Sequence, residues 1–166
     1  MYKLLIKTET ISEAKILGKR VHHYLVGQNF KVVYKLENAG DQVFPGGRFT
    51  VAIQWPNGQF EVTPYTVPSL KPKEAKQAEP ASTWGVLCRG FALFFLVDAR
   101  DKEGKDIILH KTPNDPVSRQ ASFHSVLGIE SEEIYQLWAM IAAVVSLLVL
   151  VSEKVIQLIL ASMQFR

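Results

Sequence analysis

The sequence predicts a mainly β protein: an antiparallel sandwich followed by one long C-terminal transmembrane α-helix. Three observations predict this fold class. Ile134–Val151 (IYQLWAMIAAVVSLLVLV) contains no charged residue, no glycine and no proline. Short segments before it alternate apolar and polar residues with the period of two that is typical of strands. Turn residues separate those segments at intervals of about ten residues, which favours a β-sandwich over βαβ units.

The apolar stretch is long enough to cross a bilayer. Its 18 residues make roughly 27 Å of helix, close to the ~30 Å hydrocarbon core of a membrane. No helix breaker stands at Ser152, so we expect the helix to continue to about Met163. The chain therefore divides into a β-sandwich domain, residues 1–130, and a transmembrane helix with a short tail, residues 131–166.

The clearest strand is Phe30–Leu36, in which every second residue is a large apolar one. Pro56-Asn57-Gly58 predicts a tight hairpin turn, because Asn-Gly adopts positive φ angles readily. Further strands are expected at Tyr2–Thr8, Arg20–Val26, Phe49–Trp55, Phe60–Tyr65, Trp84–Asp98, Asp106–Lys111 and Ala121–Ile129.

Two segments are not predicted as regular strands, and one strand is unusual. Ser12–Arg20 is expected to hold a helical turn capped by Ser12, and Lys71–Pro80 to form a polar loop that carries at most a short edge strand. Trp84–Asp98 is apolar on both faces, so it lies in the middle of a sheet or presents its second face to another surface. The expected core residues are Val32, Tyr34, Val51, Ile53, Trp55 and Phe95.

The composition excludes several classes of function. The 166 residues include 19 basic and 16 acidic ones, a net charge of +3, which is too balanced to indicate a nucleic-acid partner. Cys88 is the single cysteine and we expect it to be a small buried apolar residue. The opening MYKLLIK is too short to be the apolar core of a signal peptide, which favours a domain that is not exported.

Four segments resemble the "NxG … L-x-P-x-E … V-D" layout of bacterial and archaeal immunoglobulin-like domains of the CARDB type. They are Glu37-Asn38-Ala39-Gly40, Phe49–Trp55, Leu70-Lys71-Pro72-Lys73-Glu74 and Phe95-Leu96-Val97-Asp98, within roughly residues 28–110. This chain has Lys73 where the pattern usually has a glycine. The resemblance implies an immunoglobulin-like, seven-stranded sandwich that is used for binding or spacing and is usually non-enzymatic.

No catalytic or metal-binding motif stands out. The chain has no glycine-rich phosphate loop, no G-x-S-x-G, no CxxC and no HExxH. His22 and His23 are adjacent and would point to opposite faces of a strand. Acidic residues between Asp98 and Asp106 surround a turn, where a loosely bound cation is the alternative to plain solvation. We therefore expect no enzyme, no cofactor and no metal site.

The predicted helix has one distinct face. Positions that step by three and four from Gln136 collect seven of the twelve small or polar residues between Gln136 and Gln164, and this spacing is typical of a helix–helix contact. Small residues permit close approach in lipid, and polar ones can bond between helices. This row reads Gln136, Ala139, Ala143, Ser146, Leu150, Glu153 and Gln157, and continues to Leu160 and Gln164.

Two functions remain open for this row. The first is a packing seam of a homo-oligomer, which makes the protein a membrane-anchored interaction or structural module with a possible protein partner for its β-domain. The second is a pore in a ring of four or more helices, where Leu150 would form a constriction and Glu153 would favour cations. The expected partners are the lipid bilayer and further copies of the chain.

The side of the membrane that holds the β-domain is indicated by conflicting signals. A C-terminal span with no signal peptide favours a cytoplasmic β-domain. Three glutamates, Glu130, Glu132 and Glu133, precede the span and Lys154 follows it, which points the other way. Domains of this length translocate with little regard to charge, so the cytoplasmic side is slightly favoured.

Overall fold

The computed structural model describes residues 2–164, with side chains described as far as Gln157. These residues form two compact units, of which the first ends at Ile129 and the second begins at Glu130. We call the first unit the β-domain. The second is the helix α1 (Ser131–Gln164) with the one residue before it.

The β-domain consists of strands, as the alternating sequence predicts. In chain order they are β1 (Leu4–Ser12), β2 (Lys15–Ile16), β3 (Lys19–Arg20), β4 (Tyr24–Leu25), β5 (Asn29–Asn38), β6 (Gly47–Gln54), β7 (Phe60–Val67), β8 (Ala75–Gln77), β9 (Ser82–Gly85), β10 (Gly90–Asp101), β11 (Leu109–Thr112), β12 (Asp115–Pro116) and β13 (His124–Ile129).

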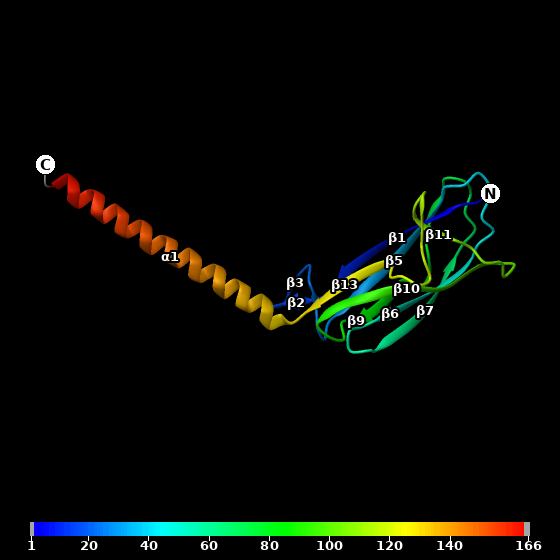
Figure 1. The fold of residues 1–166 in the computed structure, drawn as a ribbon, viewed down its shortest axis with the longest axis horizontal. Coiled ribbons are helices and arrows are strands. Elements are labelled where there is room, and N and C mark those ends of the chain that lie inside the picture. The colour runs from blue at the N-terminus through cyan, green and yellow to red at the C-terminus, as the bar shows by residue number, and fades with distance from the viewer. Residues whose placement is uncertain (1, 165–166) are drawn as a thin grey trace. The chain divides into compact units, whose positions relative to one another are not determined.

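The strands form two main sheets and a small hairpin (Figure 1). The first sheet has the order β12-β11-β1-β5-β8, and β9 pairs with another part of β5. The second has the order β4-β13-β10-β6-β7, and β2 pairs only with β3. Most pairs are antiparallel; β1–β11 and β4–β13 are parallel. The predicted fold class, a mainly β sandwich with one long C-terminal helix, is confirmed.

The core lies between the two sheets. In β5, Phe30, Val32 and Tyr34 are all at most 1% exposed, because alternate residues of a strand point to one face. Residues of β6 meet them from the second sheet, and Tyr34 packs edge-on against Phe49 with ring centroids 5.4 Å apart. Trp55 follows β6 and is 2% exposed. Five of the six predicted core residues are therefore buried.

The sixth predicted core residue, Phe95, is not part of the buried core. In the part of β10 around Phe95 the buried positions are Ala92, Phe94 and Leu96, so Phe95 lies on the opposite face and is half-buried. The run around it is apolar at nearly every position, so periodicity could not show which alternate set faces inward.

Two predicted elements also differ from the structure. Ser12–Arg20 was expected to be helical but forms the end of β1 and the hairpin β2–β3, because strand pairing across the turn supplies the backbone bonds instead. Trp84–Asp98 was expected to be one strand but is divided between β9 in the first sheet and β10 in the second. Residues 86–89 carry the chain from one sheet to the other.

Candidate functional site

The helix α1 is the first candidate site. It starts after Glu130, whose backbone N–H donates to the Glu133 carboxylate at 3.2 Å, as in a capping box. Residues Ser131–Gln157 are long and apolar enough to cross a membrane, and an 18-residue window within them has a mean hydropathy of 2.3. Every described side chain from Tyr135 to Gln157 is exposed, so this apolar surface has no cover within the described part of the chain.

The predicted row of small and polar residues lies on one side of α1. At about 100° per residue, an unbroken helix places positions 136 to 157 of this row within an arc of about 100°. The exposed row consists of Gln136, Ala139, Ala143, Ser146, Leu150, Glu153 and Gln157. We call it the α1 seam. Leu160 and Gln164, which continue the row in sequence, lie beyond the side chains that the structure describes.

Hydrogen bonds within α1 use part of the polar capacity of the seam. The Ser146 hydroxyl donates to the carbonyl oxygen of Ala142 at 2.8 Å, so its proton is engaged and its oxygen remains an acceptor. Lys154 lies 3.5 Å from the side-chain oxygen of Gln157. Gln136 and Glu153 are exposed and are the seam residues best suited to bonding with a second helix.

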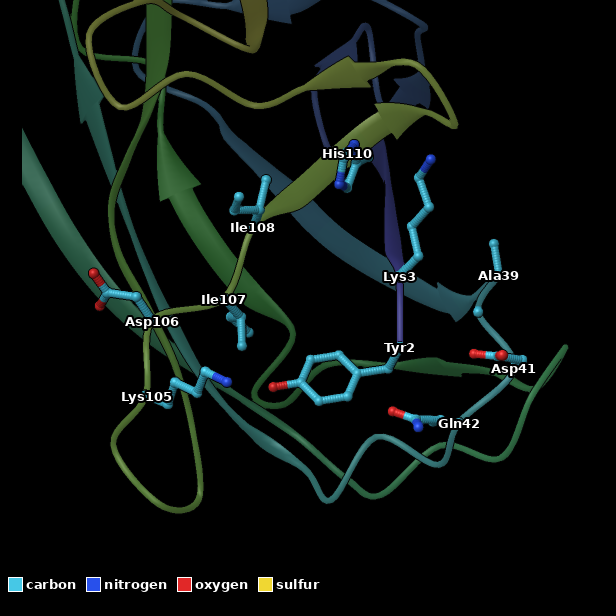
Figure 2. Close-up of a pocket in the computed structure, with 11 residues that line it drawn as sticks. Tyr2, Lys3, Ala39, Asp41, Gln42, Lys105, Asp106, Ile107, Ile108 and His110 are labelled. Atoms are coloured by element: carbon cyan, nitrogen blue, oxygen red, sulfur yellow. The ribbon is translucent and has the colours of Figure 1, made fainter.

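A cavity of about 760 Å³ is the second candidate site, at the end of the β-domain where β1 begins (Figure 2). The turn after β5 and the segment before β11 form its walls. Lys3, Asp41, Lys105 and Asp106 give it charges of both signs, His110 adds an imidazole, and Ile107 and Ile108 form an apolar side. The sequence did not indicate this cavity, because its walls are far apart in the chain and share no motif.

The polar groups near the cavity are largely engaged with the protein. Asp101 is 7% exposed and accepts hydrogen bonds from the Tyr2 hydroxyl at 3.0 Å and the Lys105 backbone N–H at 2.9 Å. Burial acts to raise the pKa of Asp101, but these donors hold it below its usual value. Burial and then the Asp101 bond raise the pKa of Tyr2. Burial and then neighbouring Lys3 lower the pKa of His110.

Asp98 and Asp106, beside the turn that follows β10, pair with arginine side chains. Asp98 lies 3.1 Å from Arg100 and 3.7 Å from Arg119, and Asp106 lies 3.6 Å from Arg119. Within residues 2–157, no group of three His, Cys, Asp or Glu side chains is placed to hold a metal.

The outer face of the second sheet is the third candidate site. Its exposed apolar side chains are between 37% and 67% exposed and lie on three strands, β7, β10 and β13, of which β10 and β13 are neighbours and β7 is separated from β10 by β6. Cross-strand neighbours such as Phe91 and Leu127 are directly paired. We call this set the apolar outer face; it comprises Phe60, Val62, Phe91, Leu93, Val97 and Leu127.

Comparisons with known proteins concern the fold. The chain is similar to the crystal structure of the CARDB domain of a Pyrococcus furiosus protein in complex with di-metal ions, with 21% identity and a TM-score of 0.48 over 77% of this chain and 89% of that one. An X-ray structure of a structural genomics target is similar at 14% identity and a TM-score of 0.40, over 70% and 82%. No family model matches the chain, and no curated protein matches its sequence.

Proposed function

We propose that the protein is a membrane-anchored, homo-oligomeric β-sandwich protein that acts as a non-enzymatic interaction or structural module. The observation that carries this proposal is the α1 seam on a helix whose side chains from Tyr135 to Gln157 are mostly apolar and all exposed. Apolar surface alone gives helices no reason to associate in lipid, whereas small residues allow close packing and polar ones supply bonds.

The test measures the oligomer size of the purified full chain in detergent, for the wild-type protein and for two matched variants. Ala143→Leu enlarges a seam residue and should weaken or rearrange the oligomer, because it holds the helix backbones apart. Val144→Leu enlarges the neighbouring residue outside the seam and should leave the oligomer unchanged. A monomeric wild-type protein, or equal behaviour of both variants, would contradict the proposal.

Membrane anchoring has its own test. The full chain should require detergent or lipid, and a fragment of residues 1–130 should be soluble and rich in strand by circular dichroism, because α1 lies outside the fragment. A full-length chain that stays soluble and monomeric without detergent would exclude the anchor.

The apolar outer face supports association of β-domains as well. The face spans four strands, of which β6 contributes no large exposed apolar side chain. At about 4.8 Å between strands and about six residues a strand, its whole area is roughly 400 Å², half of the ~800 Å² that each partner buries in a standard interface. We propose a second copy of this chain as the partner. An area this small is insufficient alone, so the contact would form only when α1 holds two copies together.

A pore is the second candidate function, favoured by the carboxylate of Glu153 on the seam. In a ring of four or more helices, the polar seam residues would line a channel, with Leu150 as an apolar constriction. These residues are Gln136, Ser146, Glu153 and Gln157. Glu153→Gln should then lower cation preference in liposome flux while the oligomer stays intact. In a packing seam the same change should alter oligomer stability only modestly. A dimer in detergent would exclude the pore.

We also propose that the β-domain lies on the cytoplasmic side. The glutamates before the span oppose this orientation, but a domain of this length is placed with little regard to such charges. Protease protection in sealed membrane vesicles of known orientation tests it, since a cytoplasmic β-domain is digested from that side only.

A further inference from the structure

The hairpin β2–β3 ends in a turn whose sequence does not suit its conformation. Leu17 has φ of +50° and Gly18 has φ of +78°, and Ile16 pairs with Lys19 across them. Two positive φ angles define a turn that favours Asn-Gly, and the left-handed conformation is unfavourable for leucine. Leu17 is nevertheless 88% exposed. Neither turn chemistry nor burial explains an apolar residue here.

Cations surround this apolar tip. Lys15, Lys19 and Arg20 are all exposed, and the described structure gives none of them an ion pair with a carboxylate. One half-buried acidic residue, Glu13, lies near the base, beside Lys15 and Arg20. The segment from Glu13 to Arg20 has three basic residues and one acidic, so its net charge is +2. An apolar tip flanked by cations is suited to an anionic lipid surface.

The hairpin lies at the end of the β-domain from which the chain continues into α1 (Figure 1). β4 follows the hairpin and pairs with the end of β13, where Leu25 is opposite Ile129. The Val26 backbone N–H also donates to the Ile129 carbonyl at 3.0 Å. Leu25 lies about one strand spacing from Ile129, and the five peptide units from Arg20 to Leu25 span at most about 18 Å. Arg20 is therefore within about 25 Å of Ile129. Only Glu130 stands between Ile129 and α1.

We propose that the β2–β3 hairpin binds the anionic surface of the bilayer that α1 crosses. Lys15, Lys19 and Arg20 contact lipid phosphates, and Leu17 enters the boundary between headgroups and acyl chains. This inference rests on the proposed membrane anchoring by α1. The contact gives the β-domain a second attachment point, which limits its rotation above the membrane.

The test uses the full chain in phosphatidylcholine vesicles with or without about a third of phosphatidylglycerol, a composition chosen to vary surface charge. Cys88→Ala removes the native thiol. A Leu17→Cys variant then carries an environment-sensitive dye, and lipid-borne quenchers report contact. The control site is Glu103→Cys, in the turn after the far end of β10. We expect quenching at position 17 in anionic vesicles, at least threefold weaker in neutral ones, and none at position 103.

Two variants separate lipid contact from folding. The triple change Lys15→Gln, Lys19→Gln and Arg20→Gln, made in the labelled protein, should reduce quenching at position 17 to the neutral-vesicle level. Leu17→Asn suits the turn better, so the variant should keep the fold. In the unlabelled wild-type protein, anionic vesicles should slow hydrogen exchange of the hairpin backbone amides, and Leu17→Asn should abolish this slowing.

The outcomes distinguish the two proposals. Protein that is lost from vesicles on alkaline extraction contradicts the anchor itself. Protein that is retained, with position 17 unquenched in anionic vesicles, overturns the hairpin inference alone. The dye response could instead change with the number of protein copies per vesicle and be the same in neutral and anionic vesicles. That result would assign the hairpin to a contact with a second copy, and it would also overturn the hairpin inference.

Discussion

The backbone N–H of Lys73 donates to the carbonyl oxygen of Asn38 at 2.7 Å, which joins two motif segments that are 35 residues apart. The Asn38 N–H in turn donates to the Glu74 carbonyl at 2.9 Å. The Asn38 side chain donates to the carbonyl oxygens of Gln42 at 2.7 Å and Leu70 at 3.1 Å. The motif residues that resemble a CARDB layout therefore bind one another and connect loops of the sandwich.

Replacing Asn38 should destabilise the β-domain. Asn38 is fully buried, and its side chain also accepts from the Gly40 N–H at 3.1 Å. Asn38→Ala removes these bonds from a fully buried site, so we expect a loss of about 2–3 kcal/mol. Urea denaturation of residues 1–130 measures it. Asn57→Ala, in an exposed turn, serves as the control and should cost clearly less.

Lys73→Gly should stabilise the β-domain. Lys73 has φ of +65° and occupies the third position of a turn closed by the Glu74 N–H and the Lys71 carbonyl at 3.0 Å. With Pro72 before it, this is the geometry of a type II turn, which favours glycine at that position. We expect a gain of about 0.5–1 kcal/mol in thermal or urea unfolding. Lys71→Gly, at a residue without positive φ, should instead be neutral or destabilising.

Trp55 and Phe95 should respond differently to truncation. Trp55 is 2% exposed and meets Phe30 edge-on at 6.4 Å, so Trp55→Ala should cost about 3–5 kcal/mol. Phe95 is half-buried on the other face of its sheet, so Phe95→Ala should cost about 1 kcal/mol or less. Equal losses in urea denaturation would mean that Phe95 belongs to the core after all.

The difference between Trp55 and Phe95 illustrates what the sequence could predict. Strands with clean alternation, such as Phe30–Leu36, revealed which face is buried because polar residues marked the other face. β10 has apolar residues on both faces, so the prediction that Phe95 points into the core was wrong. The hairpin β2–β3 was missed because Leu17-Gly18 is not an expected turn sequence. α1 was predicted well because length and apolarity alone identify such a helix.

The candidate sites differ in the same respect. The α1 seam depends on spacing within one helix, which the sequence displays directly. The cavity near Tyr2 depends on long-range pairing of β1 with β5 and β11, which no local pattern encodes. The sequence predicts Asn38 only as part of a turn motif. Its burial depends on the loops that contain Gln42 and Leu70, which contact Asn38 only in the folded chain.

The stability of the β-domain should fall as the pH is lowered. Burial lowers the pKa of His124, whose ring packs edge-on against Phe94 at 5.2 Å. The folded state therefore binds its proton less readily than the unfolded state, and stability declines as the pH falls below the unfolded value of about 6.5. Urea denaturation of residues 1–130 between about pH 7.5 and about pH 5 measures the effect.

A paired substitution isolates the contribution of His124 to this pH dependence. His124→Phe keeps a ring at the position and removes the titratable group, so the decline should become shallower. The exposed His23→Gln is the control and should leave the decline unchanged. An identical pH dependence in wild type and His124→Phe would assign the effect to other groups, of which His110 is the first to test.

The parallel pairing of β4 with β13 has a mechanical consequence. β13 is hydrogen-bonded to β10 on one side and to β4 on the other, and it is the strand that leads into α1. Hydrogen bonds of a sheet run across the strands, so tension applied along β13 loads many of them at once. Opening them one after another would require far less force. A pulling force on α1 would therefore be resisted by hydrogen bonds loaded in shear on β13, the strand to which the force is first transmitted.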